Sequence, residues 1–62
     1  MLPQNFRTVN HGYNANDQHV ALYVDTKDNT YWLCVNGRLM VGDKDRDKMD
    51  KLFQRATAAN SR

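Results

Sequence analysis

A chain of 62 residues has room for one small domain. A domain of this size buries only about 60% of the surface that its unfolded chain exposes, so it often depends on a disulfide, a metal or a partner chain. Cys34 is the single cysteine, which excludes a disulfide within one chain and is typical of a reducing compartment. No apolar run is long enough to span a membrane, and the polar amino terminus lacks the apolar core of a signal peptide, so we expect a cytoplasmic protein.

The charge balance gives little support to strong nucleic-acid binding. Nine Lys and Arg residues against seven Asp residues leave a net charge of +2. Domains that bind nucleic acid tightly usually carry a larger and more concentrated positive charge. Any role in nucleic-acid binding therefore has to come from a local cluster of cations.

Residues 1–18 predict an N-terminal arm in front of a single domain that comprises the whole chain, 1–62. The segment is polar and rich in asparagine. Its apolar residues fall at spacings of four, three and four, which permits a short amphipathic helix: Leu2, Phe6, Val9 and Tyr13. Gly12 and the asparagines would end such a helix early. A brief ordered turn or strand and a flexible arm remain as alternatives.

Residues 19–42 predict a three-stranded antiparallel sheet. The segments HVALYVDT and TYWLCV are rich in β-branched and aromatic residues, and turn-forming residues (KDN) separate them. Asn36-Gly37 follows TYWLCV and precedes RLMV. Asn-Gly between apolar runs is the strongest short-range signal for a hairpin, because both central positions of a type I′ turn need a positive φ.

Residues 43–59 predict one C-terminal amphipathic helix, which makes the expected fold α+β. Apolar residues recur at i, i+3, i+4 and i+7, the spacing that places them on one helix face: Met49, Leu52, Phe53 and Ala56. Gly42 ends the preceding strand, and Asp43 or Asp45 can cap the first turn of the helix. The helix is expected to pack on one face of the sheet.

The turns predict which residues share a face of the sheet. A two-residue turn pairs Cys34 with Leu39, Leu33 with Met40 and Trp32 with Val41, and the first turn pairs Tyr23 with Cys34. One face is then aliphatic: Val20, Leu22, Val24, Tyr31, Leu33, Val35 and Met40. The other face carries the aromatic residues: Ala21, Tyr23, Trp32, Cys34, Leu39 and Val41.

Both predicted faces are apolar, whereas a sheet with one solvated face should alternate apolar and polar residues. One helix can cover only one of them. We therefore expect the aromatic face to bind a partner through Tyr23, Trp32, Cys34, Leu39 and Val41. The partner is either a second copy, giving a homodimer, or a larger target that the chain serves as an accessory or inhibitor protein. In the alternative, the arm folds back and covers this face itself.

No catalytic or metal-binding motif is present. Asp43, Asp45 and Asp47 have the spacing that starts an EF-hand loop, but Lys48 and Gln54 occupy the positions that need glycine and glutamate. The soft-metal ligands His11, His19 and Cys34 lack the paired spacing of zinc motifs. We therefore expect a non-enzymatic protein without a cofactor or a metal, which does not bind a membrane.

A basic stripe on the predicted helix supplies the alternative function. Lys44, Lys48, Lys51 and Arg55 recur at i, i+4, i+7 and i+11 and cluster on one side of a helix. Such a stripe can contact phosphates, and it can equally be a solvated face in which aspartates pair with lysines. Nucleic-acid binding through these four residues is the second hypothesis, after protein binding.

Overall fold

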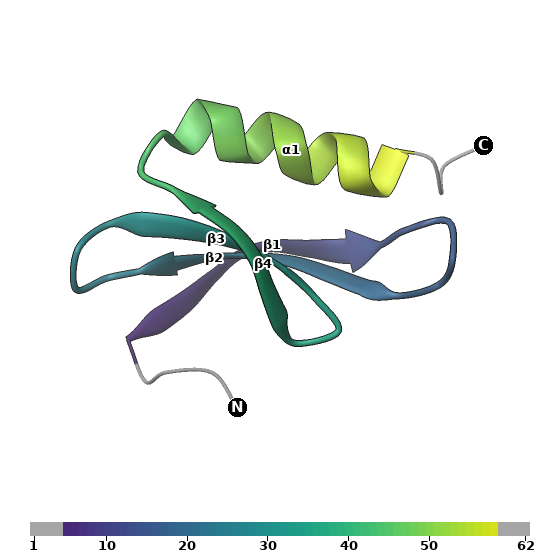
Figure 1. Cartoon of the computed structure of the whole chain (residues 1–62), viewed down its shortest axis with the longest axis horizontal. Coiled ribbons are helices and arrows are strands. Elements are labelled where there is room, and N and C mark those ends of the chain that lie inside the picture. Colours follow the sequence, from purple (N-terminus) through teal and green to yellow (C-terminus); the bar gives the residue numbers. More distant parts are fainter. Residues whose placement is uncertain (1–4, 59–62) are drawn as a thin grey trace.

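The computed structural model describes residues 5–58 and contains four strands followed by one helix. The strands are β1 (Phe6–Tyr13), β2 (His19–Asp25), β3 (Thr30–Val35) and β4 (Arg38–Asp43), and the helix is α1 (Arg46–Ala58). The strands lie in the order β1-β2-β3-β4, and each pairs antiparallel with the next (Figure 1). The predicted antiparallel sheet with a C-terminal helix is confirmed.

The prediction of three strands behind an arm was wrong, because part of that arm forms β1. This strand lies at the edge of the sheet, with β2 as its only neighbour among the described strands. Most of its residues are exposed, so its sequence lacks the alternation of apolar and polar residues that is typical of a strand with one buried face. Leu2 and residues 59–62, which the predictions included, lie outside the described residues.

The Asn36-Gly37 turn between β3 and β4 is confirmed. Asn36 has a φ of 52° and Gly37 a φ of 81°, as a type I′ turn requires. Asn36 also ties this turn to the start of β2. Its backbone N–H donates to the carbonyl oxygen of His19 over 2.7 Å, and its Oδ1 accepts from the His19 N–H over 3.1 Å.

The loop between β2 and β3 is centred one residue nearer the N-terminus than the predicted pairing required. Tyr23 pairs with Trp32, and Ala21 pairs with Cys34, so the predicted pairing of Tyr23 with Cys34 was wrong by two residues. Short polar side chains close the loop: Asp25 Oδ1 accepts from the Lys27 N–H, and Asp28 Oδ1 accepts from the Thr30 N–H. Because the shift is even, every residue of β2 and β3 keeps its predicted face.

Each edge strand contains a β-bulge. In β4 the extra residue is Met40, so Val41 pairs with Leu33 and Gly42 pairs with Trp32. The predicted pairs Met40–Leu33 and Val41–Trp32 were therefore wrong. The bulge places Gly42 opposite Trp32. A Cβ at position 42 would lie 2.6 Å from the Trp32 ring, so glycine at this position leaves room for the indole. In β1 the unpaired residue is Val9.

Helix α1 packs on the aliphatic face, as predicted. The buried core consists of residues from β2, β3 and α1: Val20, Leu22, Leu33, Met49 and Phe53. Leu52 and Ala56 pack beside it and are partly buried. Gly12 of β1 lies close to α1, because a Cβ there would be 3.4 Å from Thr57 Cγ2 and 3.7 Å from Phe53 Cζ.

The helix begins three residues later than predicted, because Asp45 is its N-cap. Asp45 Oδ1 accepts a hydrogen bond from the Lys48 N–H over 3.2 Å, and the Asp45 carbonyl oxygen accepts from the Met49 N–H over 3.1 Å. Asp43 in turn accepts from the Asp45 N–H over 2.9 Å. The chain therefore passes from β4 to α1 through a short, hydrogen-bonded corner.

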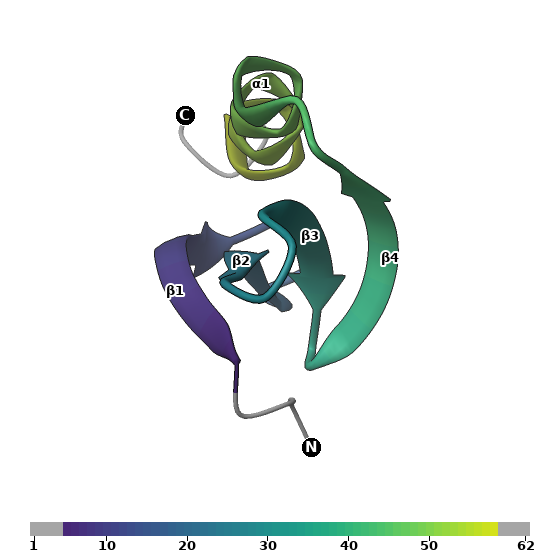
Figure 2. The ribbon, with the colours of Figure 1, turned by 90° about the vertical axis from the view of Figure 1, so that its left-hand side faces the viewer.

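The sheet is strongly twisted and has the helix on one side only. In the end-on view of Figure 2, α1 lies above the sheet, and the first residues of β1 and β4 both lie on the side away from it. The two edge strands thus curve round the face that α1 does not cover. We call this face the open face.

Candidate functional site

The open face gathers most of the aromatic side chains of the molecule. The register places on it four aromatic residues and both histidines: Phe6, Tyr13, Tyr23, Trp32, His11 and His19. Within the described residues, no helix or strand lies over this face. The sheet therefore presents aromatic surface on the side opposite to the aliphatic core.

One end of the open face is a row of packed rings. The ring centroids of Phe6 and Tyr23 lie 5.9 Å apart at an angle of 36°. Trp32 is paired with Tyr23 across β2 and β3, and its ring lies against the backbone of Gly42. These three aromatic side chains are half-buried, so each retains exposed ring surface and is held by its neighbours.

The centre of the open face is a buried floor of small side chains. Ala21 and Cys34 oppose each other, and each is only 1% exposed. Burial raises the pKa of the Cys34 thiol, which favours its protonated form. Leu39, which pairs with Cys34 from β4, is 44% exposed and forms the rim.

The other end of the open face carries the two histidines beside Tyr13. The ring centroids of His11 and His19 lie 5.8 Å apart, and those of Tyr13 and His19 lie 5.5 Å apart with an edge-on geometry. These residues come from β1 and β2, and the antiparallel hairpin between the two strands brings them together.

The strand residues of the open face are almost uncharged. Arg7 pairs with Val24 and Arg38 pairs with Val35, and both therefore lie on the side of α1. Asp25 is the single charged strand residue of the described chain that the register places on the open face, and its Oδ1 accepts the Lys27 N–H. This composition suits an apolar, uncharged surface of another protein.

Three of the five predicted partner-binding residues lie together at the surface of the open face: Tyr23, Trp32 and Leu39. Cys34 lies beneath them in the floor, and Val41 lies opposite Leu33 on the side of α1 because of the bulge. The contribution of β1 to the open face was not predicted. The bulge at Val9 shifts the alternation between Thr8 and His11, so the sequence shows no continuous period of two.

Three residues of the predicted basic stripe, Lys48, Lys51 and Arg55, are exposed on α1, whereas Lys44 precedes the helix, so the prediction of four basic residues on one helix was wrong for Lys44. A shallow hollow of about 470 Å³ is lined by Leu52, three of the basic residues and two carboxylates: Lys48, Lys51, Arg55, Asp45 and Asp47. Lys48 Nζ also lies 3.1 Å from Asp43 Oδ2 in a surface ion pair. Hydrogen bonds from the Asp45 N–H and from Lys48 hold the pKa of Asp43 below its ordinary value. An anion bound here would meet carboxylates as well as ammonium groups.

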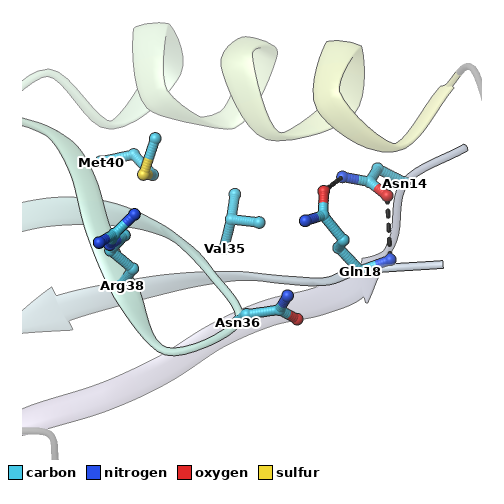
Figure 3. A pocket seen from close by; sticks show the side chains of 6 residues that line it. All are labelled: Asn14, Gln18, Val35, Asn36, Arg38 and Met40. Carbon is cyan, nitrogen blue, oxygen red and sulfur yellow. Dashed lines mark hydrogen bonds between the residues drawn. The ribbon is translucent and has the colours of Figure 1, made fainter. Parts of the chain in front are cut away.

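A second hollow, of about 530 Å³, lies on the side of α1 between two turns (Figure 3). Val35, Arg38 and Met40 line one part of it, and Asn14, Gln18 and Asn36 line the other. The amides already serve the turns. Asn14 Nδ2 donates to Gln18 Oε1 over 2.9 Å, and Asn14 Oδ1 accepts from the backbone N–H groups of Asn16 and Gln18. This hollow offers no pair of groups suited to acid–base chemistry.

Comparison of the chain with protein-family models, with characterised proteins and with solved structures finds no match. Among residues 5–58, no helix is long and apolar enough to cross a membrane. The same residues contain no group of three or more His, Cys, Asp or Glu side chains placed to share a metal ion.

Proposed function

We propose that this chain is a small non-enzymatic protein-interaction module that binds a second copy of itself through the open face. The observation that carries the proposal is the row of Phe6, Tyr23 and Trp32 on the side of the sheet that α1 leaves uncovered. Aromatic side chains of this kind dominate the binding energy of protein interfaces, typically by more than about 2 kcal/mol each.

The packing of the row supports a binding role. The rings are held by one another and by the backbone of Gly42, so little side-chain freedom is lost when a partner contacts them. Ala21 and Cys34 in the floor are already buried from solvent. The surface that a partner would cover therefore consists of the aromatic rings and Leu39. A preorganised surface of this kind binds with a small entropic cost.

A second copy fits the charge of the open face. Because its described strand residues include no Lys or Arg, two copies related by a two-fold axis would bring no cations together. The basic side of α1 would point away from such a contact. A dimer would also add buried surface to a chain whose length allows only a small core.

The test is the mass in solution by light scattering over a dilution series in moderate salt. We expect a dimer that dissociates on dilution, and we expect Leu39→Lys to shift the chain to the monomer. Met40→Lys is the matched control, because Met40 is the next residue, is 59% exposed and lines the hollow on the side of α1. A monomer at every concentration, or equal effects of the two variants, would contradict the proposal of a second copy.

If the chain is a monomer, the open face remains the surface with which an accessory or inhibitor protein would grip a larger target. Nucleic-acid binding through Lys44, Lys48, Lys51 and Arg55 is the other candidate, and it predicts a steep loss of affinity as salt rises. Contact through the apolar open face predicts little salt dependence. The carboxylates beside the stripe place this second candidate behind the first.

A further inference from the structure

The two histidines of the chain lie eight positions apart in the sequence and meet on the open face. His11 pairs with Ala21, and His19 pairs with Tyr13, so the two imidazoles occupy a diagonal position across β1 and β2. Their ring centroids lie 5.8 Å apart with an angle of 45° between the planes. Diagonal neighbours on one face of a sheet lie within reach of long and aromatic side chains.

This separation suits two imidazoles that share one metal ion. A coordinating nitrogen lies about 2.0–2.1 Å from zinc and about 1.1 Å from the centre of its own ring, so each ring centre lies about 3.2 Å from the ion. For angles of about 90–130° at the metal, the ring centres are then roughly 4.5–5.8 Å apart. The observed distance of 5.8 Å is at the upper end of this interval.

We propose that His11 and His19 form a two-histidine chelate for a divalent first-row transition-metal ion. Imidazole nitrogen is a preferred ligand of Ni(II), Cu(II) and Zn(II). The Tyr13 and His19 rings pack in an edge-on geometry that restricts the orientation of His19, whereas His11 is exposed and can turn toward the ion. Binding of one ion by both rings requires the His11 side chain to rotate until its nitrogen and that of His19 face a common centre.

Among the described residues, the site has two protein ligands. Cys34 pairs with Ala21, the residue that also faces His11, but its side chain is only 1% exposed and is buried in the floor of the open face. The remaining coordination positions are open to water. The site therefore binds its ion reversibly and does not hold the fold together, unlike a closed four-ligand zinc site. The inference does not rest on the proposed function.

The test is a titration of the full chain with Ni(II), followed by calorimetry and by the NMR signals of the imidazoles. Chelation requires His11→Asn and His19→Asn each to weaken binding at least about tenfold, because the second imidazole acts at a high effective concentration. If the two imidazoles bound Ni(II) independently, removing one of them would lower the apparent affinity only about twofold. Single variants that bind nearly as well as the original chain, or loss of binding in Cys34→Ala, would overturn the proposal.

Two controls keep the result interpretable. His11 is exposed, so His11→Asn is expected to fold. If His19→Asn fails to fold, the Ni(II) affinity of His11→Asn alone tests the chelate. Leu39→Lys should keep the Ni(II) affinity, since Leu39 lies on β4 at the other edge of the sheet. This variant separates failure of the metal site from failure of self-association. A stoichiometry of one Ni(II) per two chains would place the ion between copies and would overturn the chelate within one chain.

Discussion

The central residues on both faces of β2 and β3 are buried, but by different means. On one side, α1 covers the long aliphatic side chains of Val20, Leu22 and Leu33. On the other side, Ala21 and Cys34 are equally buried although no described element lies over them. Small side chains at the centre, larger ones around them and the curvature of the edge strands produce this second burial (Figure 2). The centre of the open face is therefore packed, while the aromatic rings around it remain partly exposed and accessible to a partner.

The largest effect is expected from a cavity on the helix side. Leu22 is fully buried, and Leu22→Ala should cost about 2–5 kcal/mol of unfolding free energy, enough to unfold much of so small a domain. Leu39→Ala, on the rim of the open face, is the matched control and should cost far less. Urea unfolding followed by circular dichroism measures both. Equal losses would break the distinction between the two faces.

The second effect tests whether the open face is packed. A Cβ at position 42 would overlap the Trp32 ring, so Gly42→Ala should cost about 1–3 kcal/mol and shift the Trp32 fluorescence to longer wavelength. In the background of Trp32→Ala, the same change should cost much less, because the overlap is gone. Additive losses in this double-mutant cycle would show that the indole does not lie on Gly42.

The third effect is confined to the helix. Asp45→Ala removes the N-cap of α1 and should cost about 1 kcal/mol. Trp32 fluorescence in the folded variant should not change, because the open face does not depend on the first turn of α1. Asp47→Ala is a control that removes a charge from the same turn without removing the cap. A loss in Asp47→Ala as large as in Asp45→Ala would contradict the assignment of the cap.

The smallest effect concerns pH. The folded-state pKa of Asp43 lies below its ordinary value of 3.8, chiefly because the Asp45 N–H donates to it. The stabilisation by the ionised carboxylate is therefore present above pH 3.8 and is lost as the pH falls through the lower folded-state pKa. Asp43→Asn should be slightly less stable than the original chain at neutral pH, and the difference should vanish in acid. A difference that persists at the lowest pH would contradict this origin.

Local signals predicted the parts of the fold that depend on neighbouring residues in the chain. Asn36-Gly37 specified its turn, and the spacing of Met49, Leu52 and Phe53 specified the helix face. The faces of β2 and β3 also followed from alternation, although the pairing was shifted by two residues. These features need only a period or a dipeptide, both of which are visible in the sequence.

The parts that depend on distant residues were not predictable. The bulge at Met40 follows from the contact between Trp32 and Gly42, which are ten residues apart, and it moved Val41 off the open face. Strand β1 forms by pairing with the edge of β2, and its own sequence does not indicate a strand. The approach of His11 to His19 needs the register of the β1–β2 hairpin, which no spacing in the sequence discloses.

The bulges at Val9 and Met40 would also limit the growth of an assembly built on the proposed contact through the open face. Each one interrupts the outer edge of a terminal strand, and an interrupted edge is a poor template for the strand of another molecule. Sheets from successive copies are thereby discouraged from joining into a continuous ribbon. Association through the open face would then stop at a closed pair, and filament growth would have no starting edge.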